Sequence, residues 1–156
     1  TFNVISIPGH TLDHIAYTAV IDRQPVVFCG DTLFAGGCGR IFEGSPKQML
    51  NSLQKLMKLP TNTAVYCAHE YTMANLAFAT MVEPDNHDLS ERIRADQAKR
   101  DKNHATVPSS LSLELATNPF LRFDQQAVIN SAASRGADTT EAVSVFGTIR
   151  AWKDIA

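Results

Sequence analysis

The sequence is short of cysteine, of strong net charge and of long apolar runs, and each shortage excludes a class of protein. Three cysteines, Cys29, Cys38 and Cys67, occur in 156 residues, so a disulfide framework is excluded and a reducing, cytoplasmic setting is expected. The formal net charge of −2 indicates no general nucleic-acid binder. No apolar run approaches the roughly 18 residues of a membrane span, and no basic N-terminal region of a signal peptide is visible.

The composition that remains is sufficient for a folded protein. Hydrophobic residues make up 44% of the chain and charged residues 19%, which is typical of a globular protein with a sizeable core. A length of 156 residues suits one domain, or a half-domain followed by a small one. No internal repeat and no low-complexity segment is present.

The first part of the chain is predicted to be rich in strands. Short apolar segments bounded by turn residues predict strands over residues 2–7, 15–21, 26–29 and 63–68. Residues 30–44 contain five glycines and are predicted to form a loop whose backbone bends sharply. The segment Ser45–Gln48 has a capping box and a proline at the first helical position, and it predicts a helix that ends before Pro60.

The second part is predicted to be helical, with four or five helices and no convincing strand. Asp88 with Glu91 is predicted to cap one of these helices. The charged run over residues 91–102 is predicted to be a solvated helix face. The expected fold class is therefore α+β, with a β-rich domain over residues 1–72 and a helical domain over residues 73–156.

Three short segments carry residue types that bind metal, and each follows a predicted strand. They contain His10 in Pro-Gly-His-Thr-Leu-Asp-His, Asp31 in Gly-Asp-Thr-Leu-Phe and His69 in Ala-His-Glu-Tyr-Thr. Imidazole and carboxylate groups aimed from strand ends into one mouth suit zinc, iron or manganese. Taken singly, each of these residues is more often an ordinary loop or capping residue than a ligand.

These segments, in this order and near these spacings, resemble the second half of glyoxalase II, the hydroxyacylglutathione hydrolase family of the metallo-β-lactamase superfamily. The resemblance covers nearly all of the chain. It implies the second half of an αββα sandwich followed by a helical domain. It also implies hydrolysis of S-2-hydroxyacylglutathione to glutathione and a 2-hydroxy acid, a step of methylglyoxal detoxification. The family's HxHxDH signature, with four more metal ligands, does not occur in this sequence, so a truncated form is expected.

The resemblance implies a metal-binding and catalytic role for three residues. His10 would bind one metal, His69 would bind another, and Asp31 would bridge both, with zinc, iron or manganese as the metal. In the family the two metals share a hydroxide that attacks the thioester carbonyl. His14 is not a ligand in the family and is expected to orient a neighbouring loop. Asp13 stands where family members usually carry glycine; it is expected to be exposed, with a role as a substitute ligand or as a partner of the ligands as the alternative.

The resemblance also implies a binding site for the glutathione part of the substrate. Arg40 and Tyr71 match substrate-contacting residues, while Arg150 and Lys153 match a basic pair that binds the glycyl carboxylate. Their spacing places this pair on one helix face, where arginine can form a bidentate fork and lysine adds a point charge. Without the resemblance, the pair would be interpreted as solvated cations near a helix C-terminus.

Two functions from different classes stay open. One is a metal-dependent thioester hydrolase, or the substrate-binding half of one. The other is a catalytically inactive module that binds a small anion, glutathione or a partner protein. Because a half-sandwich leaves a sheet edge and an apolar face uncovered, a homo-oligomer or a covering partner chain is expected. A Cys38 nucleophile with His14 as its base is a further alternative, without positional support.

Overall fold

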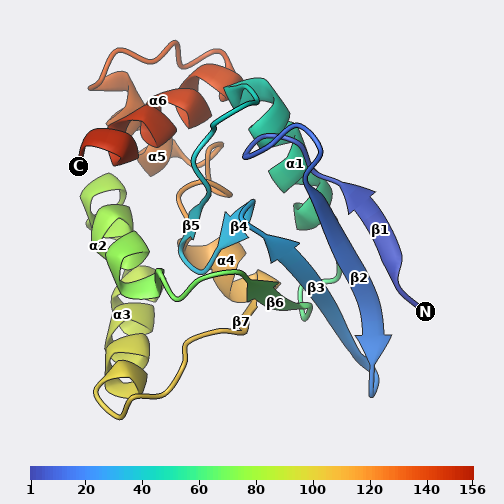
Figure 1. Ribbon diagram of the computed structural model, residues 1–156. Helices are drawn as coiled ribbons and strands as arrows, with labels where there is room; N and C mark the ends of the chain where they lie inside the picture. Colours follow the sequence, from blue (N-terminus) through green and yellow to red (C-terminus); the bar gives the residue numbers. More distant parts are fainter.

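The computed structural model describes all 156 residues as a mixed sheet packed against helices (Figure 1). The main sheet has the strand order β1-β2-β3-β6-β7, formed by β1 (Asn3–Ser6), β2 (Ile15–Ile21), β3 (Gln24–Gly30), β6 (Ala64–Cys67) and β7 (Ser109–Ser110). β2 is antiparallel to both β1 and β3, and β6 is parallel to β3. Consequently β1, β3 and β6 point the same way and end at the same edge of the sheet.

Six helices complete the fold: α1 (Pro46–Met57), α2 (Thr72–Val82), α3 (His87–Arg100), α4 (Leu111–Thr117), α5 (Gln126–Ala133) and α6 (Ala142–Ile155). Helix α6 packs against α1 and α5, and α2 pairs with α3 on the left of Figure 1. One cluster of 23 buried hydrophobic residues runs from the sheet through α1 to α5 and α6. The sheet therefore shares its core with α1, α5 and α6, and a second small cluster of Leu76, Ala79 and Leu89 lies between α2 and α3.

None of these helices combines the length and the apolar character that crossing a bilayer requires.

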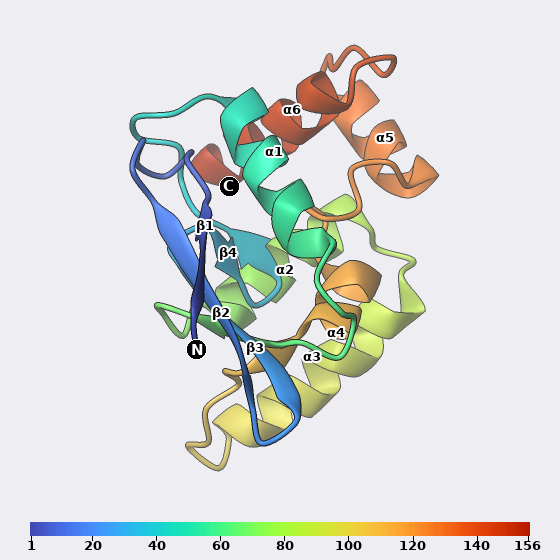
Figure 2. The same ribbon diagram turned by 90° about the vertical axis from the view of Figure 1, so that its right-hand side faces the viewer.

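One face of the sheet is left uncovered, while the helices lie on its other side (Figure 2). Val4 pairs with Tyr17, Tyr17 with Phe28, and Phe28 with Tyr66, so the four side chains form a row across neighbouring strands. Val4, Tyr17 and Phe28 are 60%, 45% and 36% exposed. The uncovered apolar face expected for a half-sandwich is therefore present.

The predicted strands and the first helix are all found, with differences at their ends. The loop predicted over residues 30–44 contains a two-stranded hairpin, β4 (Leu33–Phe34) with β5 (Gly37–Cys38). The hairpin was not predicted because the many glycines of this segment indicate a loop. The expectation of no strand in the second part is wrong, because β7 pairs with β6 at the edge of the main sheet. Two serines are too short and too polar a segment to show a strand pattern.

The capping predictions have mixed outcomes. Ser45 and Gln48 form the complete predicted capping box at α1. The prediction for Asp88 is wrong, because Asn86 is the N-cap of α3 and its side chain accepts the Leu89 N–H. Asparagine is as good a cap as aspartate, so local sequence does not decide between two such residues that lie so close together.

The charged run is only partly a solvated face. Arg92 and Asp96 of α3 are 3% and 2% exposed, and Arg92 forms an ion pair with the fully buried Glu114 of α4 at 2.7 Å. A charge is buried only when it is paired. The partner lies on another helix, so the α3 sequence alone did not reveal it.

Candidate metal centre

The three predicted metal ligands meet because their strands end at one edge. His10 lies in the β1–β2 loop, Asp31 directly follows β3, and His69 lies two residues after β6. All three line one cleft with a volume of about 500 Å³. Arg40, Tyr71, Arg150 and Lys153 line the same cleft, so the structure brings the seven predicted site residues together.

Asp31 and His69 are close enough to share a cation. Their Oδ1 and Nε2 atoms are 3.4 Å apart, which fits two ligand atoms that each lie about 2.0–2.2 Å from one metal ion. The donor atoms of His10, Asp31 and His69 do not all lie within 4.8 Å of one another, so His10 is farther than that from at least one of the other two. Asp31 and His69 would hold a metal ion here, and His10 would supply a further donor from the same cleft.

The ring of His10 is oriented by the backbone. Its Nδ1 atom is hydrogen-bonded to the Arg40 carbonyl oxygen at 2.9 Å. Because a carbonyl oxygen only accepts, Nδ1 carries a proton, and in the neutral ring this leaves the lone pair on Nε2. This pattern, with one ring nitrogen bound to a backbone carbonyl and the other free, is common in metal-binding histidines.

His14 orients the segment that carries Asp31. Its Nε2 atom accepts a hydrogen bond from the Asp31 N–H at 3.0 Å. Gly30 precedes Asp31 with a φ of +52°, and a Cβ there would come within 2.6 Å of the same Nε2 atom. A glycine is therefore required twice, for backbone conformation and for space. The neighbouring Asp13 is exposed, as expected.

The segment after His69 is held by a residue that the sequence did not reveal. The Glu70 carboxylate accepts hydrogen bonds from the Thr106 N–H, at 3.2 Å, and from the Thr106 hydroxyl. Thr106 lies between α3 and β7, so the helical part anchors this ligand segment. The His69 ring also stacks on Tyr71, with ring centroids 4.9 Å apart.

A cluster of cations lies at the C-terminal end of α6. Arg150 donates to the Cys38 carbonyl oxygen at 2.8 Å and to Asp154 at 3.0 Å. Arg40 lies 3.6 Å from the same Asp154 oxygen. Together with Lys153, three cations face the cleft and a single carboxylate compensates them, so this region attracts an anion.

The three cations of this cluster, Arg40, Arg150 and Lys153, differ in how deeply they are buried. The Arg150 side chain is 5% exposed and its Nε atom has no hydrogen-bond partner, whereas the Arg40 side chain is 65% exposed. Burial, reinforced by the positive charge of Arg150, lowers the pKa of Lys153 below its usual value. An anion in the cleft would relieve the cost of burying this ammonium group.

The alternative of a Cys38 nucleophile finds no support in the structure. Cys38 is buried, and burial raises the pKa of its thiol, which opposes the thiolate form that attacks. The Nε2 atom of His14, its supposed base, is occupied by the Asp31 N–H.

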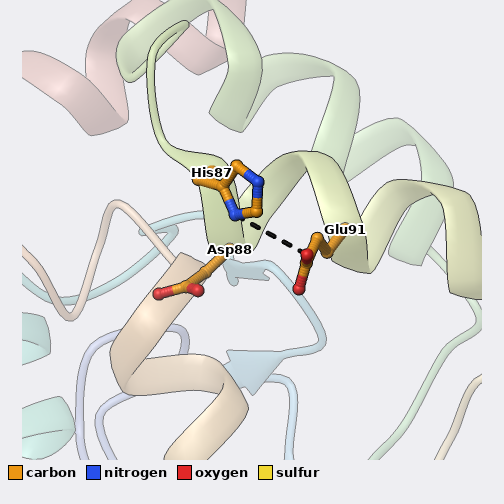
Figure 3. A group of neighbouring side chains, drawn as sticks. All are labelled: His87, Asp88 and Glu91. Atoms are coloured by element: carbon orange, nitrogen blue, oxygen red, sulfur yellow. Dashed lines mark ion pairs between the residues drawn. The ribbon is translucent and has the colours of Figure 1, made fainter.

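A second group of possible metal donors lies on the surface, and none of its residues lines the cleft. His87, Asp88 and Glu91 offer donor atoms within 4.8 Å of one another at the start of α3 (Figure 3). All three are exposed, and Figure 3 shows Asp88 directed away from the His87–Glu91 ion pair. The N-terminal end of a helix is positive, so it disfavours a cation. We therefore assign this exposed group no function.

Buried polar residues behind the cleft also escaped sequence reasoning. Asn75, Glu114 and Asn118 are at most 2% exposed and hydrogen-bond to backbone atoms of the β4–β5 hairpin. The available signal was Glu114 in Leu-Ser-Leu-Glu-Leu, because a single acidic residue within an apolar run needs a buried partner.

Two family models match the chain end to end. Residues 1–69 match the metallo-beta-lactamase superfamily, and residues 70–156 match the hydroxyacylglutathione hydrolase C-terminus. The first name implies a divalent metal. It also agrees with the mixed sheet and the donors at its edge.

Curated relatives carry the same name at high identity. The chain is 56% identical over 154 residues to a hydroxyacylglutathione hydrolase of Nitrosomonas eutropha and 52% identical to one of Pseudomonas aeruginosa, in each case over 98% of this chain and 59% of the relative. A Synechococcus relative is 52% identical, over 99% of this chain and 59% of its own. The chain thus spans about three fifths of the length of these relatives.

Among solved structures, the chain is similar in fold to ETHE1 from Myxococcus xanthus. The TM-score is 0.55 at 23% identity, covering 96% of this chain and 44% of that one.

Proposed function

Because this chain belongs to the hydroxyacylglutathione hydrolase family of the metallo-β-lactamase superfamily, we propose that its cleft serves the metal-dependent hydrolysis of S-2-hydroxyacylglutathione. The observation that carries this proposal is the joint lining of one cleft by Asp31 and His69 and by the cations Arg40 and Lys153. A thioester of glutathione has a carbonyl to be attacked and carboxylates to be held, and the cleft offers groups for both.

The donors present fit a divalent metal. The carboxylate of Asp31 lies beside the Nε2 atom of His69, and the ring of His10 is turned so that its own Nε2 atom is free. We take zinc as the metal, while iron and manganese fit the same nitrogen and oxygen donors. When bound, such an ion lowers the pKa of a water toward ~7, so that hydroxide is available at neutral pH.

The remaining steps belong to the chain's own residues. His14, through the Asp31 N–H, keeps the carboxylate at the mouth of the cleft, and Tyr71 shields one face of the His69 ring from water. Lys153 and Arg40 bind the glycyl carboxylate, because they are the accessible cations. Arg150 adds positive charge from within while it holds the Cys38 carbonyl.

A second candidate is a non-catalytic module that binds glutathione or a related anion. It is favoured because the donor atoms of His10, Asp31 and His69 do not all lie within 4.8 Å of one another, so they do not bind one common ion as they stand. The cation cluster of Arg40, Arg150 and Lys153 does not depend on a metal. This module would retain the anion site alone.

The test is hydrolysis of S-lactoylglutathione by the purified 156-residue chain with added zinc. We expect zinc-dependent turnover that is lost in His10→Ala and kept in His87→Ala, a control that removes the exposed donor group on α3. A rate no greater than that of His10→Ala would contradict the hydrolase proposal.

A binding measurement then separates the two candidates. S-methylglutathione is a thioether that cannot be hydrolysed, and calorimetry should detect its binding. We expect Lys153→Met to weaken that binding roughly 10-fold, the loss of one charge-assisted hydrogen bond. Binding without turnover would establish the module, and absence of both would exclude the two candidates together.

The setting and partners follow from the same residues. All three cysteines are free thiols, which agrees with a reducing cytoplasm. The uncovered row from Val4 to Tyr66 is suited to a second copy of the chain or to a covering polypeptide.

A further inference from the structure

The hairpin β4–β5 is held at its tip by side chains from α4, which lies beside it in Figure 1. Glu114 accepts a hydrogen bond from the Gly36 N–H at 2.8 Å. Asn118, the C-cap residue of α4, donates to one carbonyl oxygen of each hairpin strand at 3.3 and 2.9 Å. The hairpin connects Asp31 to Arg40, so both the metal-binding and the substrate-binding predictions depend on its position.

The hairpin depends on these contacts because it has few of its own. Each of its strands has two residues, which is far too short for independent stability. Every residue from 32 to 39 is buried, and Glu114 and Asn118 are fully buried. Water is therefore excluded from the hairpin's backbone groups, and only protein groups can satisfy them.

The Glu114 carboxylate has as many acceptor sites as there are donors around it. It receives four donors: the Gly36 N–H, Asn118 Nδ2, the Ser109 hydroxyl and Arg92 Nη2, the last at 2.7 Å. A carboxylate has about four lone-pair sites and no donor, so it can accept all four, and Arg92 compensates its charge. A glutamine would turn an NH2 group toward at least two of these donors.

The base of the hairpin lies against the metal ligand. The Gly39 N–H donates to the Thr32 carbonyl at 3.1 Å, and the Gly39 Cα is packed so closely on the Asp31 carbonyl that no Cβ would fit. A hairpin held at its tip therefore presses its base on Asp31. Interiors packed this closely transmit displacements.

We propose that Glu114 is a positioning residue, which sets the location of Asp31 and Arg40 by fixing the β4–β5 hairpin through Gly36 and Asn118. Its consequence for metal affinity rests on the proposed function, whereas its effect on the hairpin does not. The helical part would thus control the geometry of a ligand carried by the sheet.

The test compares the full chain with Glu114→Gln and with Glu83→Gln. Glu83 is a matched control, because it is equally buried in the helical part and pairs with Arg122 at 2.8 and 3.0 Å without touching the hairpin. Amide hydrogen exchange by NMR is measured at Thr32, Gly36 and Gly39, and zinc affinity by calorimetry.

We expect Glu114→Gln to lower protection at all three amides at least roughly 10-fold beyond the change in Glu83→Gln, and to weaken zinc binding roughly 10-fold. Faster exchange at Gly36 alone would overturn the proposal, as would unchanged zinc affinity with a mobile hairpin. If the unaltered chain binds no zinc, the proposed function fails, and exchange at Thr32 and Gly39 still decides the positioning role. If Glu114→Gln does not fold, Asn118→Ser replaces it with the same expectations.

Discussion

Single side chains in the cleft are placed at a cost to stability. Lys153 is half-buried beside Arg150, and the Nε atom of Arg150 has no partner. Burial of charge and of unsatisfied donors is unfavourable unless something compensates it. Asp154 is the only carboxylate in contact with this cluster. An anionic ligand bound in the cleft would compensate this excess of positive charge.

At the residue scale, Gly39 gives the sharpest prediction. A Cβ at this position would clash with the Asp31 carbonyl oxygen, so Gly39→Ala must displace the segment that carries Asp31. We expect a loss of roughly 1–3 kcal/mol in the free energy of unfolding, typical of overpacking. The amide NMR signals of Asp31 and Thr32 should shift as well.

Gly136→Ala is the matched control for this substitution. Gly136 has a φ of +87° but nothing within 4 Å of its missing Cβ. Its cost of roughly 1–2 kcal/mol comes from the left-handed backbone alone, and the signals around Asp31 should stay in place. Unchanged Asp31 signals in Gly39→Ala would show that the hairpin base does not constrain the ligand.

At the scale of elements, α1 connects the sheet to α6. Its buried stripe includes Met49, Leu50, Leu53 and Leu56, and its capping box joins Ser45 to Gln48. Met49 also lies directly against Gly9, next to His10. The helix therefore supports one ligand loop from behind while its cap limits fraying at the start.

We expect Ser45→Ala to lower the free energy of unfolding by about 1 kcal/mol, because the Gln48 N–H loses its acceptor. Urea denaturation with an unchanged m-value measures the difference. Ser90→Ala is the control: Ser90 is exposed within α3, and alanine there should be neutral or slightly stabilising. Equal losses in both variants would show that the capping box contributes nothing.

The β4–β5 hairpin could not be predicted from the local sequence, unlike the longer strands and the first helix. The strands at residues 15–21 and 63–68 and the helix from Ser45 were predictable because their periodicity and caps are local. The hairpin was not, because two-residue strands rich in glycine have no pattern and are held by Glu114, 78 residues away from Gly36.

At the scale of the molecule, the uncovered sheet face predicts self-association. Tyr17 and Phe28 are exposed next to each other across β2 and β3, and apolar patches of this kind favour burial. We expect light scattering at tens of micromolar to give a mass above that of one chain, and Phe28→Ser to lower it. Ile155→Ser, exposed at the end of α6, is the control that should leave the mass unchanged. A monomeric unaltered chain would contradict the prediction.

The chemistry and the fold class could be inferred before any coordinates. Residue type, order along the chain and local pattern were sufficient to identify the α+β class, the family and the candidate donors His10, Asp31 and His69. The α+β class follows from short-range rules of periodicity and capping, whereas the family and the candidate donors follow from the resemblance of three short segments to that family.

The distances were settled by folding. The 3.4 Å approach of Asp31 to His69 and the presence of His10 in the same cleft required the common direction of β1, β3 and β6. The burial of Arg150 required the packing of α6 against the hairpin. Which buried donor meets which acceptor depends on segments far apart in the chain. That pairing is determined in the core, because buried donors and acceptors cannot form hydrogen bonds with water and must find partners within the protein.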